Sequence, residues 1–397
     1  MKFKRTFLIV MDSVGIGAEP DAEKFGDAGT NTWVHTAEKC GGLNIPNLNA
    51  LGIADLADIK GTHKVSHPNS YIQTLREQSN GKDTLTGHWE MMGIYTPNPL
   101  ITFTDTGFPP ELIKELEEKT NRKYIGNYSS SGTVILEELG EEAMRDGKII
   151  IYTSADSVLQ LAAHVGVIPL DELYHCCEVA REITNKPEWK VGRVIARPFL
   201  GTCAKDFYRT SDRRDYALSP AGETSMSCLK ANGKDVIAIG KISDIFNNVG
   251  ITEGEHTTSN HDGMLKTIEI AKNKDFEGLC FVNLVEFDSS YGHRRDPLGY
   301  GKCIEEFDRD LGEFLKCMRD DDLLMITADH GNDPTHTGSD HTRERVPLIS
   351  YSKSYKNGKL LDERDTFACI GKTILKNYSV SPTENQIGTV INELLAE

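Results

Sequence analysis

The chain has 397 residues, with 44 lysines and arginines against 60 aspartates and glutamates, so its formal net charge is −16. This length exceeds one ordinary core and predicts about two domains. The acidic balance argues against binding to nucleic acid or to an anionic membrane, because no general positive charge would displace counterions from phosphates. A phosphate ligand would therefore need a local positive site.

The N-terminal segment MKFKRTFLIVMDS carries basic residues and a short apolar run, without a small-residue cleavage pattern. No run elsewhere approaches about 18 apolar residues. The nine cysteines are scattered without a C-x-x-C pair. This favours structural thiols in a reducing compartment over a disulfide or zinc role. We therefore expect a soluble, cytoplasmic protein with no nucleic-acid, membrane or obligate protein partner.

Three continuous apolar runs predict strands of a parallel sheet that helices cover on both faces. The runs span Phe7–Met11, Leu279–Phe287 and Leu323–Ala328, and they stop at Asp12, Asp288 and Asp329, respectively. Ligands of such sheets bind outside the carboxyl ends of the strands. The three acids are therefore candidate ligands at one edge of the sheet.

Two loop-like stretches, near 96–110 and 215–223, interrupt this pattern. Between them, helices are predicted at ELIKELEEKT, ILEELGEEAMRDG and DELYHCCEVAREI, and strands at KIIIYTS and VGRVIAR. Beyond them, KDVIAIGKISD resumes the sheet pattern and TFACIGKTILKNY predicts an amphipathic helix. The sequence therefore predicts an α/β fold with a core domain at 1–99 and 221–397 and an inserted domain at 100–220.

Histidines accompany two of the acids. His293 follows Asp288 by five positions, His330 adjoins Asp329, and His341 lies eleven positions further on. Carboxylate and imidazole together suit Zn, Mn or Fe, and two such sites about 3.5 to 4 Å apart form the clamp used in phosphoryl transfer. Each histidine alone is more simply a packed or surface residue. The joint pattern of three aspartates and three histidines predicts two metal sites.

The stretch GKDTLTGHWE, residues 81–90, places Asp83 and Thr84 at the start of a helix-like segment. A threonine there is ordinarily an N-cap, whose oxygen accepts a backbone N–H bond. Alternatively, a hydroxyl coordinated to a divalent metal is a good nucleophile, and a helix N-terminus adds donors for phosphate oxygens. The spacing leaves both interpretations of Thr84 open.

A series of motifs in chain order closely resembles the phosphopentomutase family of the alkaline phosphatase superfamily. They are VMDSVGIG, PDAEKFGD, GKDTLTGHWE, YTSADSVLQ, VGRVIARP, GKISDI, FDSSYGHRRDP and ITADHGNDPTHTGSDHTRE. They extend over nearly the whole chain. The resemblance implies an alkaline-phosphatase-like core, with a parallel-rich sheet between helices, and an inserted smaller α/β cap domain.

The resemblance also implies roles for single residues. Thr84 matches the residue that carries the phosphoryl group in the family. Two manganese ions, or other divalent metals, are implied: Asp12, Asp329, His330 and Thr84 would surround one, and Asp288, His293 and His341 the other.

The inserted domain holds most of the candidate substrate contacts. The strand period of VGRVIAR puts Arg193 and Arg197 on one face, and YTSADS presents Ser154 and Asp156 just past a strand. An exposed arginine on a strand is ordinarily only solvated, although its planar fork suits phosphate oxygens. The resemblance matches Asp156 to a ribose contact and assigns the distal phosphate to Arg193, Arg209 and Lys241.

The activity implied by the resemblance is the interconversion of ribose 1-phosphate and ribose 5-phosphate, and of the 2-deoxyribose pair. It would run through phosphothreonine and a sugar bisphosphate, primed by glucose 1,6-bisphosphate or a pentose bisphosphate. A cofactor-independent phosphoglycerate mutase or a phosphomonoesterase would use the same metals, but a three-carbon acid needs no contact like Asp156. A non-catalytic metal- or sugar-phosphate-binding protein would lack a ligand or the nucleophile, and none is missing.

Overall fold

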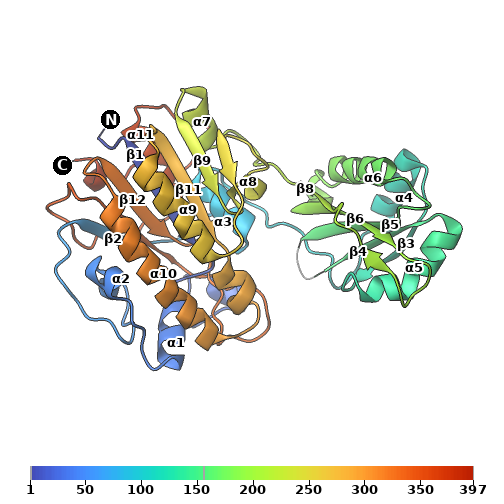
Figure 1. Ribbon diagram of the computed structural model, residues 1–397, viewed down its shortest axis with the longest axis horizontal. Helices are drawn as coiled ribbons and strands as arrows, with labels where there is room; N and C mark the ends of the chain where they lie inside the picture. The colour runs from blue at the N-terminus through green and yellow to red at the C-terminus, as the bar shows by residue number, and fades with distance from the viewer. Residues whose placement is uncertain (1, 155–156, 397) are drawn as a thin grey trace. The chain divides into compact units, whose positions relative to one another are not determined.

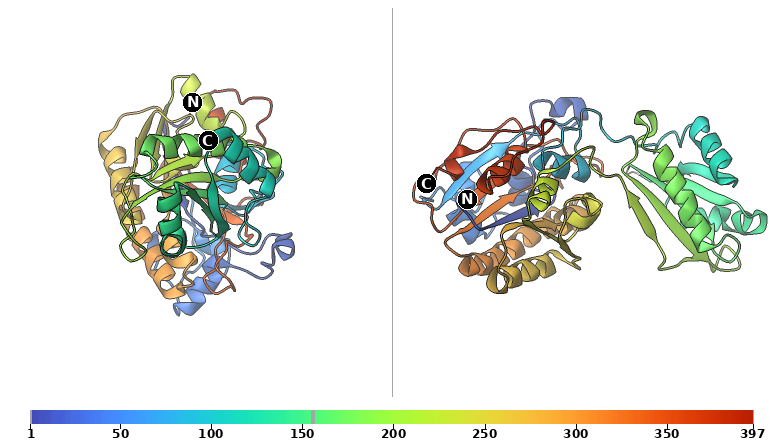
Figure 2. Two further views of the ribbon diagram at one scale, coloured as in Figure 1. Left: turned by 90° about the vertical axis from the view of Figure 1, so that its right-hand side faces the viewer. Right: turned by 90° about the horizontal axis from the view of Figure 1, so that it is seen from above.

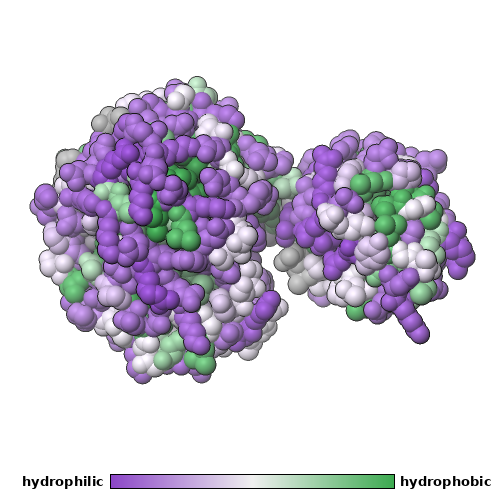
Figure 3. All heavy atoms as spheres, in the orientation of Figure 1, coloured by the Kyte–Doolittle hydropathy of each residue, from purple (hydrophilic) through white to green (hydrophobic). Residues whose placement is uncertain are grey.

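The computed structural model describes residues 2–154 and 157–396 and divides the chain into two compact units. Unit 1 comprises Met1–Asn98 and Ser219–Glu397, and unit 2 comprises Pro99–Leu218. The inserted domain expected from the sequence covers 100–220. Within the described ranges, no helix is both long and apolar enough to cross a membrane. The visible surface is mostly hydrophilic (Figure 3), in keeping with the net charge of −16.

Unit 1 is built on a seven-stranded sheet in the order β10-β9-β11-β1-β12-β13-β2. In that order the strands span Glu253–Glu255, Asp235–Ile239, Gly278–Leu284, Arg5–Met11, Asp322–Thr327, Val346–Tyr351 and Ser70–Leu75. The first five are parallel, whereas β13 pairs antiparallel with β12 and β2. Every residue of β1, β11 and β12 is buried, which explains their uninterrupted apolar runs.

Helices cover both faces of this sheet. Those that pack together on one face are α1 (Thr32–Lys39), α2 (Pro46–Ala50), α9 (Asn260–Asn273) and α10 (Pro297–Cys317). The others are α3 (Thr84–Met91), α7 (Ser225–Ala231), α8 (Ile242–Ile245) and α11 (Cys369–Asn377). Figure 1 shows α9 and α10 across the front of the sheet, and the right view of Figure 2 shows α11 on the opposite side.

One strand boundary differs from the sequence prediction. The apolar run Leu279–Phe287 predicts a single strand, but β11 ends at Leu284 and Phe287–Gly292 forms a π-helical turn. The run stays apolar because Phe287 is fully buried and packs edge-on against Phe307 of α10. A buried turn and a buried strand cannot be told apart by apolarity alone.

Unit 2 has its own sheet in the order β3-β4-β5-β6-β7, with β8 pairing to β6. The strands span Tyr124–Ser129, Ile149–Thr153, Val158–His164, Arg193–Leu200, Tyr208–Arg209 and Arg214–Ala217, and the helices α4, α5 and α6 span Pro110–Thr120, Val134–Asp146 and Leu170–Ile183. The sequence pattern missed β5, because its Leu, Ala and Gln residues are typical of helices.

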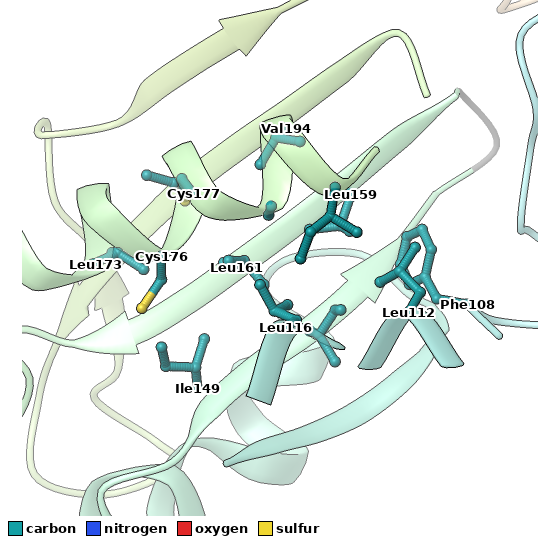
Figure 4. Close-up of a cluster of buried hydrophobic side chains, with 14 of the residues drawn as sticks. Phe108, Leu112, Leu116, Ile149, Leu159, Leu161, Leu173, Cys176, Cys177 and Val194 are labelled. Carbon is teal, nitrogen blue, oxygen red and sulfur yellow. The ribbon is translucent and has the colours of Figure 1, made fainter. Parts of the chain in front are cut away.

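The core of unit 2 lies where α4 and α6 pack on one face of this sheet. In Figure 4, Leu116 of α4 and Cys176 of α6 lie on either side of the strand residue Leu161, and Leu112 of α4 lies beside Phe108. The nine cysteines all lie within the described residues and are free thiols. Short 3-10 turns in the two units span Ala22–Phe25, Ile53–Asp55, Pro187–Trp189 and Asn392–Leu394.

Candidate metal centre

The first candidate ligand group lies where β1 and β12 end side by side. Asp12 directly follows β1, while Asp329 and His330 follow β12, and the parallel register pairs Val10 with Thr327. All three side chains are buried, and their ligand atoms lie within 4.8 Å of one another. His330 Nε2 is 3.7 Å from Asp12 Oδ1 and 3.3 Å from Asp329 Oδ2.

The second group depends on the π turn. In an α-helix, residues five positions apart point about 140° away from each other. Here the N–H of His293 donates to the carbonyl of Asp288 at 3.1 Å, and this wider turn brings both side chains to one side. Asp288 Oδ2 is 3.0 Å from His293 Nε2, and its Oδ1 is 3.5 Å from His341 Nε2.

The two groups form one continuous cluster. The imidazole rings of His330 and His341 stack with their centroids 3.9 Å apart, and His341 Nε2 lies 3.1 Å from His293 Nε2. Figure 1 places the strands that carry the first group, β1 and β12, at the centre of unit 1. The six residues that the sequence singled out as ligands therefore come together in one unit.

The donor set fits divalent cations. Burial and the negative charges of Asp329 and Asp288 raise the pKa of Asp12 to about 7. Asp12 Oδ1 and Asp329 Oδ2 are buried and accept no hydrogen bond from any described residue. The imidazole nitrogens His88 Nδ1 and His330 Nε2 lie 3.2 and 3.3 Å from Asp329 Oδ2. Cations coordinated by these oxygens would both satisfy them and remove the repulsion.

Backbone carbonyls orient the three imidazoles. Nδ1 of His341 donates to the carbonyl of Lys82 at 2.9 Å, Nδ1 of His330 to that of Gly331 at 3.0 Å, and Nδ1 of His293 to that of Ser339 at 2.6 Å. With the proton fixed on Nδ1, the lone pair of each Nε2 faces the cluster. This is the arrangement that metal-binding histidines require.

Amide donors orient the three carboxylates in the same way. Asn283 Nδ2 donates to Asp12 Oδ2 at 2.8 Å, and Asn332 Nδ2 donates to Asp288 Oδ1 at 2.8 Å. The backbone N–H of Ser13 donates to Asp329 Oδ1 at 3.0 Å. The sequence analysis missed these supporting residues, since an asparagine in or after an apolar run carries no distinctive spacing.

Thr84 lies at the first position of α3, and the helix is capped by Asp83 instead. The Asp83 carboxylate accepts from the backbone N–H of Thr86 at 3.1 Å and from its hydroxyl at 2.6 Å. The N-cap interpretation of Thr84 is therefore wrong. Its Oγ1 is 3.1 Å from His330 Nε2, beside the first ligand group. Gly87 permits this approach of α3, since a Cβ there would lie 2.1 Å from the Asp329 carbonyl oxygen.

The predicted substrate residues are distributed over both units. Ser154, Arg193 and Arg209 belong to unit 2, and Lys241 belongs to unit 1, in the exposed turn after β9. Asp156 lies outside the described residues.

One face of the unit 2 sheet gathers arginines. Arg193 and Arg197 share that face of β6, and the register sets Arg209 opposite Phe199, on the same side. Burial and the charges of Arg213 and Arg209 lower the pKa of Arg197, so these three guanidinium groups lie close together. The sequence pattern indicates no role for Arg197 and Arg213, because only the pairing of β7 with β6 brings Arg209 near Arg197, and Arg213 lies directly before β8.

Loss of one candidate ligand should lower metal content without unfolding the chain. We expect His341→Ala to weaken the affinity for the second manganese ion by at least about 10- to 100-fold. Removing a residue that only orients a metal ligand already lowers metal affinity by about this factor. Metal analysis after reloading measures this. His261→Ala is the matched control, since His261 is exposed and pairs only with Asp310 among the contacts described. An unchanged metal content in His341→Ala would contradict the assignment.

Comparison with known proteins is consistent with this centre. A model of the metalloenzyme superfamily matches residues 4–382. A phosphopentomutase from Clostridium botulinum is 55% identical over 394 residues and 99% of each chain. One from Agathobacter rectalis is also 55% identical, over 99% of this chain and all of its own. The structure of Leishmania mexicana phosphoglycerate mutase covers 98% of this chain and 97% of its own at a TM-score of 0.50, and its 12% identity shows likeness of fold alone.

Proposed function

The chain belongs to the phosphopentomutase family, and from this membership we propose that it interconverts ribose 1-phosphate and ribose 5-phosphate, and likewise the 2-deoxyribose phosphates. It is then an isomerase of small sugar phosphates that moves a phosphoryl group between two positions of one sugar. The observation that carries the proposal is the Thr84 hydroxyl 3.1 Å from His330 in a cluster of six candidate ligands.

In this proposal Thr84 is the phosphoryl carrier. Phosphorylated Thr84 transfers its group to the free hydroxyl of a pentose monophosphate, which gives the bisphosphate. The bisphosphate then presents its other phosphate, and Thr84 Oγ1 attacks that phosphorus while the sugar oxygen leaves. A bisphosphate such as glucose 1,6-bisphosphate, or a pentose bisphosphate, supplies the first phosphoryl group. The position of Thr84 at the start of α3 supports this role, because backbone N–H groups there favour phosphate oxygens.

The proposed metals are two manganese ions. Asp12, Asp329, His330 and Thr84 would hold one, and Asp288, His293 and His341 the other. When bound, divalent cations supply positive charge that offsets the charge of the phosphoryl group in transfer. The Nε2 atoms of the three histidines, which face the cluster, and the two carboxylate oxygens without hydrogen-bond donors support this assignment.

The proposal also gives unit 2 a role in substrate recognition. Arg193 and Arg209, with Lys241 of unit 1, bind the phosphate that is not being transferred, and Ser154 and Asp156 contact the pentose. The arginine-lined face of the unit 2 sheet supports this, because guanidinium groups meet phosphate oxygens in pairs. A three-carbon acid would need no pentose contacts.

Phosphorus NMR tests the proposed function. The protein is incubated with ribose 1-phosphate, Mn²⁺ and a trace of glucose 1,6-bisphosphate, and in parallel with 3-phosphoglycerate. We expect ribose 5-phosphate to form in the first sample and no 2-phosphoglycerate in the second. Release of free phosphate alone would identify a phosphatase, and isomerisation of phosphoglycerate would identify the other mutase; either result overturns the proposal.

Removing Arg193, a proposed contact of the phosphate that is not being transferred, should lower mutase activity more than hydrolase activity. Arg193→Ala deletes a charge-assisted contact worth about 1.5 to 3 kcal/mol, so we expect mutase turnover to fall about 10- to 100-fold. Thr84 should still become phosphorylated, and the ratio of free phosphate to isomerised sugar should rise.

The matched control for Arg193→Ala is Arg214→Ala. Arg214 is exposed on the same sheet but stacks against Tyr174 and Tyr216 on the other face. An unchanged rate with an unchanged product ratio in Arg193→Ala would mean that Arg193 is an ordinary solvated arginine.

A further inference from the structure

The segment 77–82, between β2 and the start of α3, is held mainly by side chains. It lies outside every described strand, although it leads directly to Thr84. The Glu90 carboxylate accepts from the backbone N–H groups of Gln78 at 2.9 Å and Ser79 at 2.6 Å. Another buried acid, Glu19, accepts from the N–H of Glu77 at 2.7 Å. Buried acids therefore take the place of a neighbouring strand along the N–H side of the segment.

One guanidinium group, that of Arg343, donates hydrogen bonds to the backbone carbonyls of this segment. Arg343 Nη1 donates to the carbonyls of Ser79 at 2.9 Å and Gly81 at 2.5 Å, and Nη2 donates to the carbonyl of Glu77 at 2.8 Å. The same guanidinium binds the carboxylates of Glu77 at 2.8 Å and Asp21 at 3.1 Å. Its side chain is only 4% exposed. The carbonyls of residues 77, 79 and 81 thus converge on a single buried arginine.

The same segment contacts the candidate metal centre. The carbonyl of Lys82 accepts from His341 Nδ1 at 2.9 Å, and Arg343 follows His341 by two positions. The carboxylate of Asp27 joins the two segments, because Asp27 Oδ2 accepts from the backbone N–H of Arg343 at 2.9 Å and from Lys82 Nζ at 3.0 Å. Residues 341–343 therefore bind residues 77–82 at several successive points.

We propose that Arg343 is a positioning residue, which fixes the segment before Thr84 against the segment that carries His341. The nucleophile and a ligand of the second metal would then keep one mutual geometry through both phosphoryl transfers. The inference rests on the proposed role of Thr84. It goes beyond it, since Arg343 contacts neither the ligand groups nor Thr84 through any hydrogen bond or ion pair described.

An arginine suits this position for a geometric reason. Its planar fork presents five donors at fixed angles, whereas lysine has a compact ammonium group with three donors. Arg343→Lys therefore keeps the charge that faces the buried acids but cannot span the three carbonyls. Arg345→Lys is the matched control: Arg345 lies on the same segment and binds the carbonyl of Ala18 and the carboxylate of Glu363, away from residues 77–82.

The test is steady-state kinetics of both variants with ribose 1-phosphate, beside thermal unfolding and manganese content. Misplacing reacting groups by about 1 Å costs about 100-fold, so we expect kcat of Arg343→Lys to fall by about that factor. KM should stay within about twofold, because substrate binding groups are untouched. Phosphorylation of Thr84 by glucose 1,6-bisphosphate should slow in parallel. Arg345→Lys should match the wild type.

The outcomes separate this inference from the proposed function. If neither the wild type nor Arg345→Lys turns over, the proposed function fails. If both turn over and Arg343→Lys keeps its kcat, or loses only what its unfolded fraction explains, Arg343 is a structural arginine and the inference fails. If Arg343→Lys does not fold, Asp21→Asn is the deciding variant. It removes the charge of a partly exposed carboxylate that binds the Arg343 guanidinium, and so weakens the hold on that group. We expect kcat about tenfold lower at constant KM, and an unchanged kcat overturns the inference.

Discussion

Replacing Thr84 by valine is expected to lower mutase turnover by at least about 10⁴-fold, the scale of losing a nucleophile that acts with its partners as a unit. Valine keeps the branched shape of threonine and removes the hydroxyl that lies 3.1 Å from His330 Nε2. Because Asp83 caps α3, the helix should stay intact and the fold should be unchanged. Turnover of ribose 1-phosphate, with circular dichroism and metal content as companions, measures this.

Thr84→Ser is the control for the hydroxyl itself. It keeps the attacking oxygen, so it should retain a measurable fraction of the activity and gain one phosphoryl group on the peptide that contains residues 83–90. Thr86 should carry none, because it is fully buried and its hydroxyl donates to Asp83 at 2.6 Å. Phosphorylation of Thr86 in the wild type, or of Ser289, the hydroxyl residue directly after Asp288, would assign the nucleophile to that residue instead.

Removing the metals should have an effect of similar size. Two cations near a transferring phosphoryl group supply several kcal/mol of stabilisation, so chelation should lower turnover by at least about 10³-fold. Without them, burial and the negative charges of Asp329 and Asp288 oppose the ionisation of Asp12 and raise its pKa. Re-addition of Mn²⁺ should restore turnover, and the metal content should return to about two bound ions per chain.

Thermal unfolding gives an independent measure of the same prediction. Cations that bind the folded chain stabilise it by mass action, so the unfolding temperature should rise as Mn²⁺ is titrated into the chelated protein. Full activity in a sample that metal analysis finds empty would exclude a catalytic metal centre. A trace of bound metal after reloading would exclude the two-metal assignment.

The strand-end residues could be predicted from the sequence because burial leaves a clear signature. The apolar runs before Asp12 and Asp329 favour central strands, and acids at the carboxyl ends of such strands are conspicuous. The family resemblance implied that Asp288 and His293 share a metal site, but the π turn that brings their side chains together was not predicted. A π turn is defined by backbone hydrogen bonds between residues five positions apart, such as that from the N–H of His293 to the carbonyl of Asp288, and such bonds have no sequence pattern.

The groups that hold the ligands and Thr84 in place could not be predicted from the sequence, for a related reason. The carbonyls that orient the imidazoles, such as that of Lys82, belong to the backbone and are the same for any residue type. Arg343 stands in the stretch HTRER, where charged residues ordinarily indicate an exposed surface. Only the fold shows that it is buried among the carbonyls of residues 77–81.

The most direct test of the central claim follows the phosphoryl group through Thr84. Protein primed with ³²P-labelled glucose 1,6-bisphosphate is freed of small molecules and mixed with unlabelled ribose 1-phosphate, and the reaction is quenched over time. The account predicts that label leaves Thr84 at the rate of turnover and appears in pentose bisphosphate and then in pentose monophosphate. Label that stays on the protein during turnover, or that leaves only as inorganic phosphate, would contradict it.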